Sequence, residues 1–162
     1  MWAARVARTK TAMQSTTKRP QSSLLRRELE ETLREVDSAL RAMGGGDHES
    51  YTALWDDSPD VTLFGAWGPI ERGTEAVRST FEWVGSRFGD GELVPDNVVV
   101  HMSGALACTI GFERGNVSID GGPPQPMTLR TTHVYRYTRA KWHLVHRHAD
   151  FPPSDQRLAR VA

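Results

Sequence analysis

The sequence predicts an α+β domain in which three N-terminal helices pack on a curved antiparallel sheet. Two observations predict this class. Apolar residues recur at helical spacing in the first half of the chain, whereas from Leu93 onwards the chain is rich in β-branched and aromatic residues. Helices first and strands afterwards are typical of an α+β architecture. A length of 162 residues without internal repeats fits one such domain.

Three segments carry the helical pattern. The first begins at Ser22 or Ser23, both good N-caps, and has an apolar residue every three or four positions as far as Met43. Three glycines follow and end it. A shorter helix is expected from Asp47, and a third over residues 74–88.

The strand pattern predicts an antiparallel sheet. A short strand is expected first and four long strands afterwards, at residues 60–67, 93–102, 105–117, 127–137 and 142–150. Ser103-Gly104 and residues 138–141 are short enough to join neighbouring strands as hairpins.

The charge is unevenly distributed. The chain has 20 Lys+Arg and 20 Asp+Glu, but its first 27 residues hold seven basic residues and no acidic one. The remainder therefore holds 13 basic against 20 acidic residues. Its negative charge argues against nucleic acid and anionic membranes as partners. The sequence contains no run of about 18 apolar residues, so no membrane span is predicted.

These patterns divide the chain into a disordered basic tail (1–22), a folded domain (23–155) and a C-terminal tail (156–162). The Arg-rich, acid-free start is typical of organellar transit peptides, although a solvated tail or a start codon set too far upstream would have the same composition. We expect a cytoplasmic protein, with organellar targeting as the alternative. A contact of the tail with an acidic surface is a further hypothesis. The single cysteine, Cys108, lies among apolar residues and is interpreted as a buried thiol.

Three motifs resemble a known family. They are Gly68-Pro-Ile-Glu-Arg-Gly-Thr-Glu-Ala-Val-Arg78, Leu129-Arg-Thr-Thr-His-Val-Tyr-Arg136 and Trp142-His-Leu-Val-His-Arg-His-Ala-Asp150. In this order they are similar to the SnoaL-like, or ketosteroid isomerase-like, branch of the nuclear transport factor 2-like superfamily, over roughly residues 24–153. The resemblance implies a cone-shaped roll, a pocket between the concave face of the sheet and the helices, and commonly a homodimer through the outer face. Such folds host enzymes and association domains alike, so the fold does not give the function.

The resemblance places Arg130, Thr132, His146 and His148 on the pocket side of the sheet. One of the two histidines is a candidate general acid or base, since residues two apart on a strand share a face and imidazole titrates near neutral pH. Asp150, or alternatively Asp56 and Asp57 after the second helix, would orient an imidazole. Arg130 would stabilise negative charge. The alternatives are histidines that merely hydrogen-bond at a wet sheet edge and an Arg130 held in an ion pair.

Four aromatic residues, Tyr51, Trp55, Phe64 and Trp67, are candidates for lining the pocket, or are simply core. As pocket walls they would suit a small apolar ligand of polyketide or steroid type. His146-x-His148 supplies two metal ligands on one face, with His101 or Asp150 as a possible third. Because no second spaced pair exists, neither a metal nor an organic cofactor is expected.

The functional prediction is a small-molecule isomerase, lyase or hydrolase that uses a histidine acid/base. The central strands lack the aspartates on which limonene epoxide hydrolase-like and steroid isomerase-like relatives rely. The alternative is therefore a non-catalytic ligand-binding or dimeric association domain.

Overall fold

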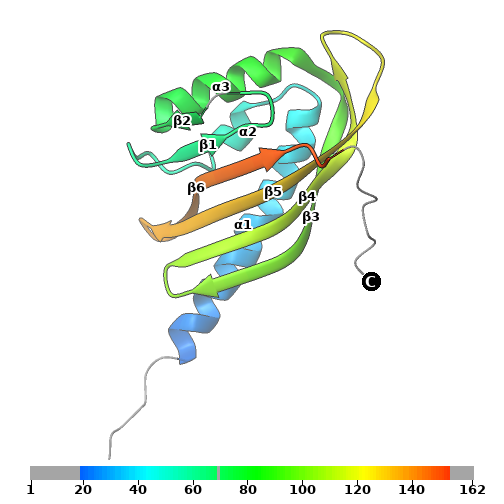
Figure 1. Ribbon diagram of the computed structural model, residues 1–162. Helices are drawn as coiled ribbons and strands as arrows, with labels where there is room; N and C mark the ends of the chain where they lie inside the picture. Colours follow the sequence, from blue (N-terminus) through cyan, green and yellow to red (C-terminus); the bar gives the residue numbers. More distant parts are fainter. Residues whose placement is uncertain (1–18, 69, 154–162) are drawn as a thin grey trace, which may run out of the picture.

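The computed structural model describes residues 19–68 and 70–153. In chain order these residues form α1 (Arg19–Gly44), α2 (Glu49–Thr52), β1 (Thr62–Phe64), β2 (Ile70–Arg72), α3 (Thr74–Arg87), β3 (Phe88–Ser103), β4 (Leu106–Ile119), β5 (Gln125–Thr138) and β6 (Lys141–Asp150). The helices pack on a curved, open sheet, so the predicted α+β class is confirmed (Figure 1). Most of both predicted tails lies outside the described residues.

The sheet has the strand order β2-β1-β6-β5-β4-β3. Neighbours are antiparallel apart from β1 and β6, which are parallel. The helix α1 crosses one face of the long strands, and α3 lies beside β1 and β2 (Figure 1). We call the face that the helices cover the inner face and the opposite one the outer face.

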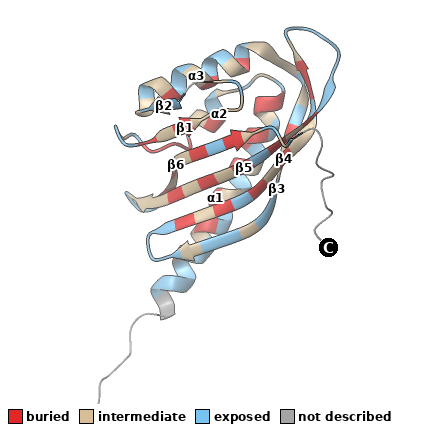
Figure 2. Ribbon diagram, in the orientation of Figure 1, coloured by how far each residue is buried: buried red, intermediate tan, exposed pale blue. Residues whose placement is uncertain are grey.

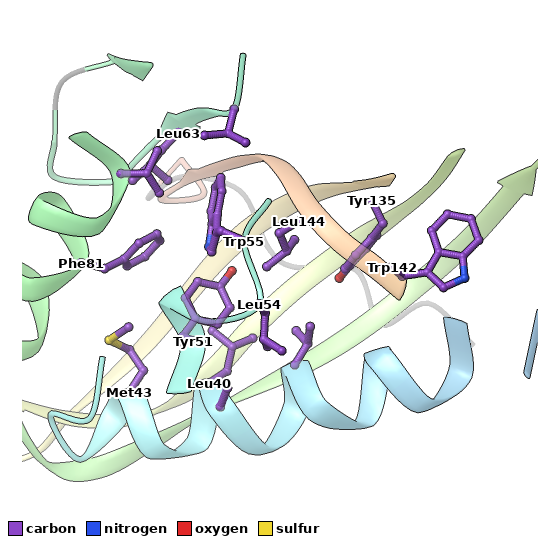
Figure 3. Packing of buried hydrophobic residues seen from close by; sticks show 14 of the residues in the cluster. Leu40, Met43, Tyr51, Leu54, Trp55, Leu63, Phe81, Tyr135, Trp142 and Leu144 are labelled. Carbon is purple, nitrogen blue, oxygen red and sulfur yellow. The ribbon is translucent and has the colours of Figure 1, made fainter. Parts of the chain in front are cut away.

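Alternation along the strands separates the two faces. In β5 every second residue is buried, namely Met127, Leu129, Thr131, His133 and Tyr135. Figure 2 shows a similar alternation on the neighbouring strands. Tyr135 packs in one buried cluster with Leu29, Val36, Leu40 and Met43 of α1, whereas Met127 and Leu129 belong to a second buried cluster with Leu93, Val117 and Ala149. Figure 3 shows Tyr51, Trp55 and Phe81 packed in the same layer. The inner face therefore carries the core.

The long helix is attached to the sheet at both ends. Near its start, the indole Nε1 of Trp142 donates a hydrogen bond of 3.0 Å to the carbonyl oxygen of Leu25. At its end the backbone of Gly44 lies so close to β3 that a Cβ atom there would be 2.4 Å from the Cα of Glu92. The helix begins at Arg19, earlier than the predicted start at Ser22 or Ser23.

Two local features differ from the prediction. The segment expected as one strand over residues 60–67 is the shorter β1, and an unpredicted strand, β2, follows it. The pairing of β5 with β6 is irregular. Val134 of β5 pairs with His146, but the next residue, Tyr135, pairs with Leu144, so Val145 is an extra residue in β6. This β-bulge changes which side chains of β6 face the helices. By contrast, the predicted cap of α2 is present, because Asp47 Oδ1 accepts the backbone N–H of Glu49 at 3.0 Å.

None of the helices in the described residues is long and apolar enough to cross a membrane.

Candidate functional site

A small cavity lies between the helices and the inner face of the sheet. Its volume is about 40 Å³, roughly the room of a few water molecules. Its walls are mostly apolar and come from α1, α3 and the sheet, among them Leu40, Met43, Leu63, Phe81, Val84, Leu93 and Leu129. Two charged side chains, Glu113 and Arg147, also line it.

Glu113 of β4 and Arg147 of β6 form a buried ion pair. Arg147 Nη2 lies 2.6 Å from Glu113 Oε2, and Nε lies 3.3 Å from Oε1. The side chain of Arg147 is 7% exposed and that of Glu113 is 0% exposed. Burial by itself lowers the pKa of Arg147, but the facing carboxylate more than offsets this and the pKa is raised. Arg147 is therefore held in its charged form.

His133 and Tyr51 extend this pair into the core. The Tyr51 hydroxyl and His133 Nε2 share a hydrogen bond of 3.0 Å, and the same nitrogen lies 3.5 Å from Glu113 Oε1. Burial lowers the pKa of His133 to about 4, with the charge of Glu113 opposing the shift. The imidazole is therefore neutral at pH 7. Desolvation also raises the pKa of Tyr51 well above its usual value, so the phenol stays protonated.

This arrangement favours binding over proton transfer in the cavity. Both oxygens of Glu113 already accept hydrogen bonds from Arg147. Within the described residues Arg147 Nη1 has no hydrogen-bond partner, so its N–H groups are free to bind an acceptor atom in the cavity.

The placement predicted for Arg130, Thr132, His146 and His148 is wrong, because these residues lie on the outer face. In β5 the alternation is as expected, but the set containing Leu129 and His133 is the one that faces inward. In β6 the buried positions change from Trp142 and Leu144 to Arg147 and Ala149, because the bulge at Val145 shifts the alternation by one residue.

On the outer face Arg130 is paired with Asp150. Arg130 Nε donates to Asp150 Oδ1 at 2.8 Å, and Nη2 contacts the second oxygen. The side chains are 46% and 42% exposed. This is the ion-pair alternative for Arg130 rather than a cation facing the cavity.

The two predicted histidines lie beside Phe64, also on the outer face. Ring centroids of His146 and His148 are 5.4 and 5.6 Å from that of Phe64. His146 Nδ1 is 2.8 Å from Thr62 Oγ1, and its pKa is lowered by burial and then by His148. His148, Arg130, Thr132 and Asp150 line a hollow of about 420 Å³ with Val98, Ile110 and Phe112.

The predicted aromatic residues are distributed over three places. Tyr51 and Trp55 belong to the core, and Phe64 lies on the outer face. Trp67 lines the cavity and is 42% exposed at its mouth.

In the part of the chain that the structure describes, no group of three or more His, Cys, Asp or Glu side chains could hold a metal ion. Burial raises the pKa of the partly exposed Cys108, which favours the thiol form.

Glu113, His133 and Arg147 were not among the predicted site residues. The signal that could have indicated them is the apolar company of His133, whose face in β5 carries Leu129 and Tyr135. Arg147 gives no such signal, because its inward direction depends on the bulge.

The roll and its cavity define a protein with the nuclear transport factor 2-like fold, and comparisons with known proteins agree. Residues 34–154 match the model of the SnoaL-like domain, and the chain belongs to this family.

One curated relative is the calcium/calmodulin-dependent protein kinase type II subunit delta of Oryctolagus cuniculus. It is 30% identical over 129 residues, which are 77% of this chain and 24% of the kinase. The chain thus matches about a quarter of that relative's length.

Three solved structures share the fold. A candidate dehydratase of the nuclear transport factor 2-like family from Streptomyces avermitilis has a TM-score of 0.68 at 19% identity, covering 81% of this chain and 98% of that one. A nuclear transport factor 2 (NTF2-like) superfamily protein from Salmonella enterica has a TM-score of 0.67 at 19% identity, covering 85% of this chain and 98% of that one. A candidate calcium/calmodulin-dependent protein kinase II association domain from Xanthomonas campestris has a TM-score of 0.65 at 19% identity, covering 79% of this chain and 88% of that one.

Proposed function

We propose that this SnoaL-like domain binds a small apolar ligand in the inner cavity without transforming it. The observation that carries the proposal is the pairing of the two charged groups of the cavity, Glu113 and Arg147, with each other. The ligand would carry a hydrogen-bond acceptor, such as a carbonyl or carboxylate oxygen, that meets the free N–H groups of Arg147. Apolar walls would bind the rest of it.

A screen of carbonyl compounds and carboxylic acids of only a few non-hydrogen atoms, the size that a cavity of about 40 Å³ admits, tests this. A compound at about 100 times its Kd should raise Tm by roughly 5–10 °C. Ala66→Phe, which fills the cavity from its lining, should abolish the shift. Thr132→Ala on the outer face is the matched control and should leave it unchanged. Recovery of the compound unaltered after prolonged incubation is expected, and formation of a product would exclude a purely binding role.

The predicted acid/base role of His146 and His148 stays a prediction. It now concerns the outer face, where His148 lines the hollow, and not the cavity.

We also propose that a second copy of the chain covers the outer face. This second role is carried by the exposure of large apolar residues there, with Val98, Leu106 and Ile110 44%, 53% and 43% exposed. Patches of this kind are typical of interaction sites. Around a two-fold axis the same patch meets itself, and the neighbouring Arg130–Asp150 pair adds no net charge that would repel the copy.

A further inference from the structure

A second hollow lies beside the cavity and also has a volume of about 40 Å³. The two spaces are direct neighbours, because four side chains line both of them: Trp67, Trp83, Val84 and Phe88. Arg87 and Ile119 complete the walls of the second hollow and do not line the cavity. Each space alone has room for only a few non-hydrogen atoms, whereas the two together suit a longer molecule.

The charges of the cavity favour a neutral polar group over an ionised one. Glu113 and Arg147 neutralise each other as an ion pair, and among the described residues no other cationic side chain lines the cavity. A carboxylate bound there would lack a counter-ion of its own in a site removed from water, which is costly. A carbonyl oxygen can accept a hydrogen bond from Arg147 without that cost.

The second hollow offers apolar surface to the rest of such a molecule. Trp67 and Trp83 are 42% and 46% exposed, so each indole retains apolar surface that a ligand can bury. Ile119 of β4 extends this wall on the side away from the cavity. Arg87 is paired with Asp120 and is 38% exposed, so water already solvates its charge and a second polar group of a ligand would gain little there.

We propose that the two spaces together bind one neutral, unbranched alkyl carbonyl compound. Its carbonyl oxygen accepts a hydrogen bond from Arg147, and its chain passes Trp67 and Trp83 and ends beside Ile119. This inference rests on the proposed function, because it uses the same cavity. It adds the chemical class of the ligand and a second space that binds the chain.

A series of methyl ketones from butanone to 2-octanone tests the chain. Titrations followed by proton–nitrogen correlation spectra of the full chain give the Kd of each ketone. Each methylene group that enters the second hollow should lower Kd about fourfold, because it is removed from water. Octanoate has a chain of the same length but carries a charge, and its Kd should be roughly tenfold or more above that of 2-octanone.

Ile119→Thr places a hydroxyl group in the second hollow and keeps the β-branched shape that suits a strand. It should reduce the ratio of the butanone Kd to the 2-octanone Kd by about threefold or more, because only the longer ketone reaches this position. Val100→Thr is the matched control. It makes the same kind of change in β3 at a residue that is 45% exposed and lines neither space, so the ratio should stay as in the wild type.

The possible failures separate this inference from the proposed function. Butanone that binds without any gain for the longer ketones would overturn the inference alone, and so would a gain that persists in Ile119→Thr. Octanoate that binds more tightly than 2-octanone would overturn the neutral class of ligand. Absence of binding for every ketone and for octanoate would overturn the inference together with the proposed function.

Discussion

At the scale of single residues, the notable feature is a polar chain inside an apolar layer. Glu113 and Arg147 are removed from water, and their mutual attraction has to offset a desolvation cost of several kcal/mol per ion. Replacing two such ions with apolar residues is often neutral or stabilising, so the pair adds little as a source of stability. The position of the pair at the cavity wall fits the binding role proposed above.

His133 makes the stability of the protein depend on pH. Its pKa is about 4 in the folded state against 6.5 normally, so between these values the unfolded chain binds a proton that the folded protein does not. Stability should therefore be complete above pH 6.5 and fall as the pH drops towards 4, by about 3 kcal/mol from this residue. Urea unfolding across this range measures the loss.

His133→Gln is the control, because it keeps a neutral hydrogen-bonding side chain but does not titrate. Other acidic and histidine groups titrate in both proteins, so the difference between them isolates His133. A difference that does not change with pH would contradict the assignment.

At the scale of secondary-structure elements, the attachment of α1 to the sheet and the bulge in β6 determine the cavity. The helix end at Gly44 lies directly against β3, which brings Leu40 and Met43 to the cavity wall. The bulge at Val145 turns Arg147 towards Glu113. Without it, the face that carries Trp142 would continue through His146 and His148.

Gly44→Ala should destabilise the protein by about 1–3 kcal/mol, as overpacking does elsewhere. The added Cβ would lie 2.4 Å from the Cα of Glu92, so helix and strand must separate. Gly89→Ala is the matched control, since a Cβ there meets nothing within 4 Å, and it should change stability by about 0.5 kcal/mol or less. The midpoint of urea unfolding should fall only for Gly44→Ala, and equal midpoints would show that the helix end is not tightly packed.

At the scale of the whole molecule, the two faces of the sheet carry different side chains. The inner face holds the core and the cavity, and the outer face presents apolar side chains without a covering element in the described residues (Figure 2). An interface of standard size buries about 1,200–2,000 Å² in total, and long strands such as β3 and β4 offer a surface of the necessary length.

If the outer face joins two copies, Ile110→Asp should convert the dimer to a monomer, because it places a charge in the centre of the apolar contact. Sedimentation velocity over a range of protein concentrations measures the change. Leu24→Asp is the control, since Leu24 is 45% exposed at the far end of α1. A wild-type chain that sediments as a monomer throughout would refute this mode of association.

The sequence by itself determined the type and order of the main elements, the fold class and the family resemblance. Helical and strand periodicities arise from local sterics, so Leu25 to Met43 and Met127 to Tyr137 identify their own structure. The tertiary structure alone decided which residues face the cavity. Alternation divides β5 into two sets without saying which is inward, and in β6 a bulge opposite Val134 and Tyr135 changes the alternation itself. Glu113 and Arg147 meet across 34 positions of chain because strand pairing, which depends on the partner strand as much as on the residues themselves, brings them together.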